Sequence, residues 1–338
     1  MADGIEIPHF IRLSDLSDRQ IEDVLELSAR IKRGVSRAEL AGRTVGMLFF
    51  RGSLRTRISL EVAMHQLGGD TVNLTAASDF WELEAREGTV MDGAAPEHIK
   101  DAATVLSSYL SALAIRPAPA GASWEVDRRD EGIHAWAACS QVPVINMESA
   151  LWHPLQALAD LLTLRETLGD LRGKRLAITW THSPEPASPA VIHSIVLAAL
   201  RNGMRVAVAH PAGFELDGGV LDEARRVSSS TGGELEIGLG METAVSGAHI
   251  VYARSWKSLE VYGNPTLAAS RMARTGDWLV DEKLMALGEE ARLMHPMPVR
   301  RNLEVTDEVL DGPRSLLYRQ AENRLHTQKG LLSLLLRR

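Results

Sequence analysis

Short runs rich in β-branched and other apolar residues alternate with longer helical patterns along this chain, and this alternation most constrains its fold. We expect strands at 44–50, 71–74, 112–116, 142–146, 175–180, 205–210, 234–237, 249–252 and 291–294. We expect helices at 56–67, 98–110, 124–139, 153–168, 190–202, 219–230, 242–247, 281–286 and 322–336. Strands that alternate with helices are typical of a parallel sheet covered by helices. The predicted fold class is therefore α/β, with doubly wound parallel sheets.

The length of the chain indicates how many such sheets to expect. Its 338 residues fit two domains of roughly 150 residues each. We place one Rossmann-like domain at 1–150 and a second at 151–319, and we expect the C-terminal helix at 320–338 to pack back on the first. In such sheets, ligands bind at the carboxyl ends of the strands. We therefore expect an active-site cleft between the two domains, built from loops that follow strands.

The charge balance and the single cysteine exclude several classes of protein. Acidic residues outnumber basic ones 44 to 37, giving a formal net charge of −7, whereas proteins that bind nucleic acid are usually basic. Cys139 has no second cysteine to pair with and fits a reducing compartment. The N-terminus lacks the pattern of a secretory signal, and no apolar run approaches the roughly 18 residues of a membrane span. We expect a cytoplasmic protein that binds neither nucleic acid nor a membrane.

Two glycine-containing stretches resemble nucleotide-binding loops, but each lacks a required residue. G-D-L-R-G-K at 169–174 is one residue short of a Walker A loop, and Arg175 stands where serine or threonine is needed. G-L-G at 238–240 opens a dinucleotide fingerprint, but Thr243 occupies the place of its third glycine. A nucleotide-dependent dehydrogenase is therefore disfavoured.

The stretch F-F-R-G-S-L-R-T-R that begins at Phe49 is typical of a strand-to-helix turn that binds an anion. The apolar strand ends at Phe50, Ser53 is a favourable N-cap residue, and a helical pattern follows. The positive end of a helix and its first N–H groups attract anions. Arg55 and Arg57 add two cations, so we expect a site for a phosphate-sized dianion. The alternative is a capped helix with two solvated arginines.

Three short motifs resemble those of the aspartate and ornithine carbamoyltransferases. S-L-R-T-R at 53–57 is similar to the carbamoyl-phosphate motif S-x-R-T-R, H-P-L-Q at 153–156 to H-P-x-Q, and H-P-M-P at 295–298 to H-[CP]-x-P. Each motif follows a predicted strand, and the three occur in the order of the family. The resemblance covers nearly the whole chain. It implies an enzyme that transfers the carbamoyl group of carbamoyl phosphate to an amine.

Further matches resemble the N-acylornithine carbamoyltransferases within that family. They are Trp81 with G-T-V-M-D-G at 88–93, I-N-M-E at 145–148, A-R-S-W at 253–256 and A-E-N-R-L-H at 321–326. The S-M-G acceptor loop of ordinary ornithine enzymes does not occur in the sequence. The resemblance therefore implies an N-acylated ornithine as the acceptor and an N-acylcitrulline as the product, in arginine biosynthesis.

The resemblance also implies which residues bind carbamoyl phosphate. They are Ser53, Leu54, Arg55, Thr56, Trp81, Arg116, His153, Gln156, Pro296, Met297 and Arg324. Arg55, Arg116 and His153 are the expected catalytic residues, because fixed donors stabilise the negative charge that attack by an amine builds on the carbonyl oxygen. No metal or other cofactor is implied. The alternatives are that Arg116 is a surface residue after a strand and that His153 packs or caps the start of a helix.

For the acceptor, the resemblance implies Glu148, Arg254 and Pro96. Arg254 replaces a lysine of the acetylornithine enzymes and keeps its charge, and Glu304 falls where some of them carry a lysine that can be carboxylated. Pro96 stands where those enzymes have glutamate and where succinylornithine enzymes have proline. A glutamate would repel a succinyl carboxylate, so we expect N-succinyl-L-ornithine to be preferred over N-acetyl-L-ornithine. The alternative is that Pro96 only begins a helix.

The tryptophan in the polar segment S-D-F-W-E-L-E bears on the assembly. Trp81 is awkward as a core residue there, and an exposed tryptophan often marks an interface. In the family this loop reaches the active site of a neighbouring subunit, so the resemblance implies a homotrimer with shared sites. Two other functions are open: a carbamoyltransferase for ornithine or another amine, and a catalytically silent ligand-binding homologue. The presence of every expected donor-site residue disfavours the silent homologue.

Overall fold

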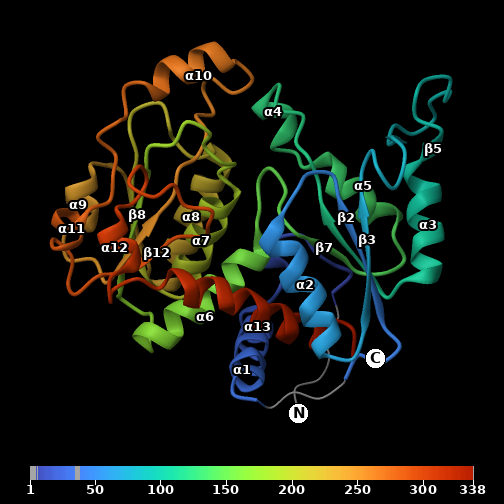
Figure 1. Ribbon diagram of the computed structural model, residues 1–338, viewed down its shortest axis with the longest axis horizontal. Coiled ribbons are helices and arrows are strands. Elements are labelled where there is room, and N and C mark those ends of the chain that lie inside the picture. Colours follow the sequence, from blue (N-terminus) through green and yellow to red (C-terminus); the bar gives the residue numbers. More distant parts are fainter. Residues whose placement is uncertain (1–4, 6, 35–38, 338) are drawn as a thin grey trace. The chain divides into compact units, whose positions relative to one another are not determined.

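The computed structural model of the chain describes residues 5, 7–34 and 39–337 (Figure 1). The chain divides into two compact units, and each is built around a parallel sheet of five strands. Unit 1 comprises Met1–Pro119, Val126–Leu158 and Arg324–Arg338, and unit 2 comprises Ala120–Glu125 and Ala159–Asn323. The predicted fold class, α/β with doubly wound parallel sheets, is confirmed. The division at residue 150 stays a prediction.

The sheet of unit 1 brings the ends of two non-consecutive strands together. Its strands, in spatial order, are β1 (His9–Phe10), β7 (Val144–Asn146), β6 (Ala112–Arg116), β2 (Thr44–Phe49) and β3 (Asp70–Thr75), all parallel. From β2 the chain goes first to β3 on one side and then to β6 on the other, so the order reverses between β2 and β6. At this reversal Phe49 pairs with Arg116. Ligands of open α/β sheets bind at such a reversal, at the carboxyl ends of the strands.

Helices pack around this sheet, most of them through one buried side. They are α1 (Asp18–Lys32), α2 (Leu54–Gln66), α3 (Ile99–Tyr109), α5 (Glu131–Cys139), the first turns of α6 (Pro154–Leu168) and the later turns of α13 (Leu317–Leu335). On one face, Ile115 and Val144 of the sheet pack with Ile133 and Trp136 of α5, all of them buried. Burial of each such side chain contributes about 1.5–3 kcal/mol.

The C-terminal half of α13 lies against α1 within unit 1 (Figure 1). A Cβ atom at Gly330 would lie 2.8 Å from the carbonyl oxygen of Val24, so only glycine allows the two helices to approach this closely. Lys329 also donates a hydrogen bond to Gln66 at the end of α2, at 2.9 Å. The end of the chain is thereby fixed beside α2.

The sheet of unit 2 repeats the same plan. Its strands, in spatial order, are β10 (Glu234–Leu239), β9 (Arg205–Ala209), β8 (Arg175–Thr179), β11 (Ile250–Ala253) and β12 (Arg292–Met294), all parallel. The order reverses between β8 and β11, where Thr179 pairs with Ala253. Around it lie the rest of α6, α7 (Ala190–Arg201), α8 (Gly218–Thr231), α9 (Met241–Val245), α10 (Pro265–Met272), α11 (Glu282–Met285), α12 (Asp307–Asp311) and the start of α13.

The predicted strands all occur, with ends shifted by up to two residues, but some expectations about helices were wrong. The helix predicted at 124–139 is two helices, α4 (Trp124–Asp127) and α5. Between them Asp130 adopts a left-handed conformation with φ 51°, and its carboxylate accepts hydrogen bonds from Ser149 and from the N–H of Ala150. These bonds tie the break to the loop after β7. Cys139, the last residue of α5, is half-buried.

Several elements were not predicted at all. They are β1, a 3-10 turn at Leu13–Asp15, α1, α10, α12 and the short strands β4 (Leu83–Glu84) and β5 (Glu97–His98). The signal for α1 is readable in the sequence, because Ser17 and Gln20 form a reciprocal capping box. Within the ranges that the structure describes, the helices are all too short or too polar to cross a bilayer.

Candidate active site

The N-terminus of α2 lies directly after β2, at the strand reversal of unit 1. The Ser53 side chain caps the helix by accepting a hydrogen bond from the N–H of Thr56 at 3.3 Å. The cap fixes the entry of the chain, so that the first N–H groups of α2 and the positive end of its dipole face outward from the strand edge. This is the anion-binding geometry that the sequence predicts.

Arg324 of α13 joins three of the predicted donor-site residues. Its guanidinium donates to the Thr56 hydroxyl at 2.9 Å, to Gln156 Oε1 at 2.9 Å and to His153 Nε2 at 3.3 Å. These partners come from α2 and from the start of α6, and all four side chains are buried. The structure therefore brings together residues from three of the motifs, within unit 1.

Arg116, at the end of β6, forms a buried ion pair that the sequence did not indicate. Its Nη2 lies 2.6 Å from Glu148 Oε2, and only 12% of its side chain is exposed, so the surface alternative for Arg116 is wrong. Arg51 Nη2 lies 3.3 Å from Glu148 Oε1 and also donates to the Glu148 carbonyl. Arg51 was missed, although its place directly after a strand and two residues before Ser53 could have indicated it.

The charge of this cluster favours a dianionic ligand. The cluster contains four arginines, Arg51, Arg55, Arg116 and Arg324, and one carboxylate, Glu148, which contacts Arg51 and Arg116. Burial depresses the pKa of Arg116, the charge of Glu148 opposes that shift, and the charges of Arg51 and Arg55 add to it. Arginine remains protonated nevertheless. The excess positive charge in a partly buried site matches a phosphate group, which arginines bind through paired hydrogen bonds.

His153 is neutral in this environment. Burial holds its pKa well below the usual value, and the neighbouring charge of Arg324 lowers it further, while Glu148 opposes the shift. The ring therefore acts at pH 7 through hydrogen bonds and not as a cation.

The protein is expected to lose stability in acid because of His153. In the unfolded chain the pKa of His153 is about 6.5. Below that pH its imidazole is protonated in the unfolded state but stays neutral in the folded state. The free energy of unfolding should then fall as the pH is lowered from 7 to 5, by up to about 1.4 kcal/mol per pH unit below 6.5. Urea unfolding at several pH values measures this slope. His153→Gln removes the group and should flatten the slope; equal slopes in the two proteins would contradict the assignment.

Arg57 does not join the cluster, contrary to expectation. Its guanidinium donates to the Thr75 hydroxyl at 2.8 Å and stacks over the Phe49 ring at 4.4 Å. In a helix, residues two positions apart face different sides. Arg55 and Arg57 therefore separate, and Arg57 packs against the sheet.

The segment with Trp81 and Pro96 is largely exposed. The Trp81 side chain is 58% exposed, and its indole N–H donates to Glu97 Oε2 at 2.7 Å. Pro96 is also exposed and directly precedes β5, which pairs with β4. The next helix begins at Ile99 with His98 as its N-cap. The alternative that Pro96 begins a helix is therefore wrong.

In unit 2, the turn after β12 is held by a buried ionic hydrogen bond. His295 Nε2 lies 2.8 Å from Glu304 Oε2, and His295 Nδ1 accepts the N–H of Met297 at 3.0 Å. Since Nδ1 accepts, the proton of the neutral ring is on Nε2 and is donated to Glu304. Burial would raise the pKa of Glu304, but the hydrogen bond from His295 and the charge of Arg254 together lower it, so the carboxylate is ionised.

Arg254 follows β11, at the strand reversal of unit 2. Its Nη1 donates to the carbonyl of Pro298 at 3.1 Å, while its buried Nε has no protein partner. Ser255 donates to Glu304 Oε1 at 3.4 Å. Arg254, Glu304 and the turn at 295–298 are thus brought together, and a buried donor of Arg254 is left for a ligand.

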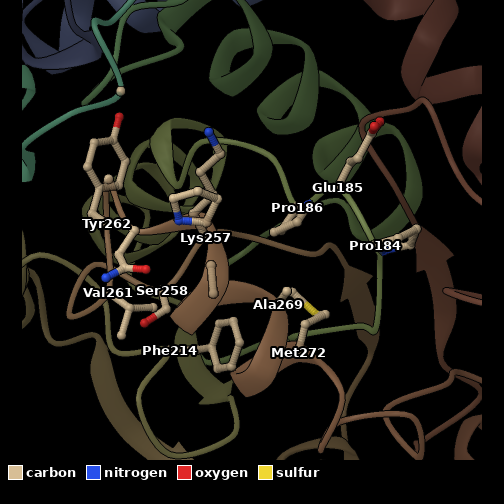
Figure 2. A pocket seen from close by; sticks show the side chains of 15 residues that line it. Pro184, Glu185, Pro186, Phe214, Lys257, Ser258, Val261, Tyr262, Ala269 and Met272 are labelled. Carbon is tan, nitrogen blue, oxygen red and sulfur yellow. The ribbon is translucent and has the colours of Figure 1, made fainter.

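A cavity of about 610 Å³ lies within unit 2 (Figure 2). The segment after β8, at Pro184–Pro186, lines one side of it, and the segment after β11, at Lys257–Pro265, lines another. Phe214 and Met272 contribute apolar side chains. None of these residues was predicted, because the sequence does not show which distant segments border a common pocket. The cavity adjoins the two segments that follow the strand reversal, where α/β sheets bind ligands.

Comparison with known proteins identifies the family. The model of the carbamoyl-phosphate-binding domain of aspartate/ornithine carbamoyltransferases matches residues 8–166, and the model of their Asp/Orn-binding domain matches residues 186–335. The chain belongs to this family. It is therefore an enzyme of the carbamoyltransferase class, as the three motifs predict.

Similar proteins include both acetylornithine and ornithine enzymes. The N-acetylornithine carbamoyltransferase of Xanthomonas campestris pv. campestris is 38% identical over 98% of each chain, and that of Xylella fastidiosa is 36% identical over 97% of this chain and 98% of its own. The ornithine carbamoyltransferase of Gloeobacter violaceus is 35% identical over 97% of this chain and 96% of its own.

Solved structures agree in fold. Acetylornithine transcarbamylase complexed with acetylcitrulline has a TM-score of 0.94 and 38% identity, over 97% of this chain and 98% of its own. A glutamate-to-proline variant of N-acetyl-L-ornithine transcarbamylase, complexed with carbamyl phosphate and N-succinyl-L-norvaline, has the same TM-score of 0.94 and identity of 38%, over 97% of this chain and 99% of its own.

Proposed function

We propose that this enzyme transfers the carbamoyl group of carbamoyl phosphate to the side-chain amine of an N-acylated ornithine, with N-succinyl-L-ornithine preferred over N-acetyl-L-ornithine. The products are an N-acylcitrulline and phosphate, as a step of arginine biosynthesis. The observation that carries the proposal is the buried junction in which Arg324 contacts Thr56, His153 and Gln156 beside the N-terminus of α2.

Residues of unit 1 bind the phosphate of the donor in this proposal. The phosphate lies at the start of α2, held by the Ser53–Thr56 turn and by Arg55 and Arg324. Arg116 and His153 donate hydrogen bonds to the carbonyl oxygen of the carbamoyl group. Gln156 and the carbonyl groups of Pro296 and Met297 contact its NH₂ group. These donors and acceptors match a planar carbamoyl group bonded to a dianion.

The substrate amine is the nucleophile, so the enzyme has to favour its neutral form. With a pKa of about 10.4, only about 0.04% of such an amine is neutral at pH 7. Burial in a site with excess cations disfavours the ammonium. Attack forms the new C–N bond and places negative charge on the carbonyl oxygen, where Arg116 and His153 stabilise it. The C–O bond to phosphate then breaks, and the leaving phosphate takes the proton of the amine.

For the acceptor we propose Arg254, Glu148 and Pro96. Arg254 offers its unpartnered Nε to a carboxylate of the acceptor. Glu148 binds the amino-acid part of the acceptor and, through its ion pair, holds Arg116. Glu304 supplies a permanent carboxylate beside Arg254. A lysine-to-glutamate variant of N-acetyl-L-ornithine transcarbamylase complexed with PALAO is among the similar structures, with a TM-score of 0.94.

The proline at position 96 favours a succinyl group. A carboxylate about 4 Å from a second carboxylate costs about 4 kcal/mol at an effective dielectric constant of about 20, and proline carries no charge. The variant of N-acetyl-L-ornithine transcarbamylase that binds N-succinyl-L-norvaline has proline in place of a glutamate, which supports this preference. Ornithine itself is the second candidate acceptor, because ornithine carbamoyltransferases are among the similar proteins.

The proposed assembly is a homotrimer with shared active sites, in the cytoplasm. Trp81 is exposed in the segment that the family resemblance places in a neighbouring active site, and Leu54, Ile58 and Val72 are exposed apolar side chains of the same unit. Exposed apolar side chains of this kind are typical of protein interfaces.

An assay of carbamoyl transfer to ornithine, N-acetylornithine and N-succinylornithine tests the proposed acceptor. We expect kcat/KM to be highest for N-succinylornithine. Pro96→Glu should restore the repulsive charge and lower kcat/KM for the succinyl substrate at least about tenfold, which corresponds to about 1.4 kcal/mol, with little effect on the acetyl substrate. Pro96→Ala is the uncharged control. A wild-type enzyme that uses N-acetylornithine or ornithine far faster than N-succinylornithine would contradict the preference.

A further inference from the structure

A fully buried polar cluster lies beside the His295 turn of unit 2 and has no part in the mechanism above. It consists of Asp160 on α6, Tyr252 on β11 and Gln320 on α13. The exposed fraction is 0% for Asp160 and Tyr252 and 1% for Gln320. Burying these groups is costly unless each is hydrogen-bonded, so the arrangement of their bonds is informative.

The side-chain amide of Gln320 has only one orientation that satisfies its neighbours. Its Nε2 lies 2.7 Å from Asp160 Oδ1, and its Oε1 lies 2.8 Å from the backbone nitrogen of His295. A carboxylate only accepts hydrogen bonds and a backbone N–H only donates one. The amide NH₂ must therefore face Asp160, and the amide oxygen must face His295. The carboxylate of Asp160 thus fixes which end of the Gln320 amide faces His295.

Tyr252 holds the other oxygen of the same carboxylate. Its hydroxyl donates to Asp160 Oδ2 at 2.9 Å. Burial, and then the charge of Asp160, raise the pKa of Tyr252 well above its usual value, so the phenol remains protonated and keeps donating. With one donor on each oxygen, the Asp160 carboxylate cannot rotate without losing a hydrogen bond.

The turn that Gln320 contacts is one that needs such support. Met297, two residues after His295, has φ 54°, a left-handed conformation that costs about 1–3 kcal/mol for a residue other than glycine. Glu304 holds the ring of His295, whereas Gln320 holds its backbone. The two contacts fix different atoms of the residue that begins the turn.

We propose that Gln320 and Asp160 are positioning residues for carbamoyl transfer: through the N–H of His295 they set the place of the Pro296 and Met297 carbonyl groups that accept hydrogen bonds from the carbamoyl NH₂. The inference rests on the proposed function, since it assigns those carbonyls to the donor. It adds two residues that touch neither substrate. A displacement of about 1 Å in such a group is enough to reduce a rate about a hundredfold.

The chain offers a matched control on the same helix. Asn323 follows Gln320 by three residues, is fully buried, and uses both hydrogens of its Nδ2 on α6, at Thr163 Oγ1 (2.9 Å) and Glu166 Oε2 (3.0 Å). Gln320 and Asn323 therefore both join α13 to α6 through a buried amide, but the Gln320 amide also holds the turn. Loss of either amide should cost similar stability.

The test compares Gln320→Met with Asn323→Leu in the full-length enzyme. We expect both to lower Tm by similar amounts. Gln320→Met should lower kcat about a hundredfold at saturating substrates, whereas Asn323→Leu should keep kcat within about threefold of wild type. Equal losses of kcat in the two variants, or an unchanged kcat in Gln320→Met, would overturn the inference.

Exchange of the two chemical groups provides a rescue. Asp160→Asn alone has one oxygen for two donors, so its NH₂ group must face either the Gln320 NH₂ or the Tyr252 hydroxyl. Gln320→Glu alone sets two carboxylates against each other. The double variant places an amide donor on α6 and a carboxylate acceptor on α13, so the bonds that join residue 160 to residue 320, Tyr252 to residue 160 and the His295 N–H to residue 320 can form again. We expect the kcat of the double variant to exceed that of both single variants at least about tenfold. A double variant no faster than the single variants would overturn the inference.

Failure of the proposed function would look different from failure of this inference. Absence of carbamoyl transfer by the wild-type enzyme with every amine tested would overturn both, whereas the outcomes of the variants concern the inference alone.

Discussion

Arg324→Met is expected to lower kcat/KM for carbamoyl phosphate at least about a thousandfold. Loss of one fixed donor to a developing charge costs roughly 10²–10³ in rate, and Arg324 also orders Thr56, His153 and Gln156 around it. The variant removes the cation and leaves buried oxygens of Thr56 and Gln156 without this donor. Steady-state kinetics gives the loss, and calorimetry should show that carbamoyl phosphate binding is lost with it.

Arg324→Lys is the matched control for charge. Lysine keeps the positive charge but lacks the planar fork that reaches several acceptors at once. We expect its kcat/KM to lie between those of the wild type and Arg324→Met. The account would be contradicted if Arg324→Met stayed within about tenfold of wild type while its unfolding transition was unchanged.

Arg116→Gln is expected to destabilise the fold as well as to abolish most activity. Breaking a buried ion pair by removing one partner costs about 3–5 kcal/mol, because the remaining charge is left buried. In this variant Glu148 still has Arg51 as an ion-pair partner, at 3.3 Å. We therefore expect a loss of stability near the lower end of that range. The free energy of unfolding, measured with urea, gives its size.

The double variant Arg116→Gln with Glu148→Gln separates stability from catalysis. It removes both charges, so most of the lost stability should return. Activity should not return, because the proposed cation at the carbonyl oxygen of the donor and the proposed carboxylate at the acceptor are both missing. Recovery of activity in the double variant would show that Arg116 acts only as the partner of Glu148. A single variant as stable as the wild type would contradict the buried ion pair.

Local chemistry explains why the capped turn at the start of α2 could be predicted from the sequence. Ser53, Arg55 and Thr56 lie in one continuous turn, and a strand followed by an N-cap and a helix determines its geometry. The parallel sheets follow from the alternation of strands and helices in the same way. The family motifs then indicated His153, Gln156 and Arg324, which the fold brings to that turn across 97 residues or more of sequence.

Pairing of charges across the fold could not be predicted in this way. The expected acceptor role of Glu148 stays a prediction, but its position between Arg116 and Arg51 was not foreseen, because it depends on the ends of β2, β6 and β7 meeting at one edge of the sheet. Arg57 was expected beside Arg55, but helical rotation turns it toward Phe49. Both outcomes depend on which strands are neighbours and on which side of a helix faces them.

The break in the helix at 124–139 and the position of the pocket could not be predicted from the sequence either. The helix at 124–139 has a continuous helical pattern, and only the hydrogen bonds between Asp130 and the loop at 149–151 show why it stops. The cavity beside Phe214 and Met272 is formed by segments that lie far apart in the chain. Such features depend on tertiary contacts, which local propensity does not contain.

The central claim is that the start of α2 holds the phosphate of the donor, and a crystal structure of the enzyme with carbamoyl phosphate tests it most directly. The account predicts density for the phosphate within hydrogen-bond distance of the Ser53–Thr56 backbone, the Arg55 guanidinium and the Arg324 guanidinium. A structure with carbamoyl phosphate bound elsewhere, and with this turn free of it, would contradict the account.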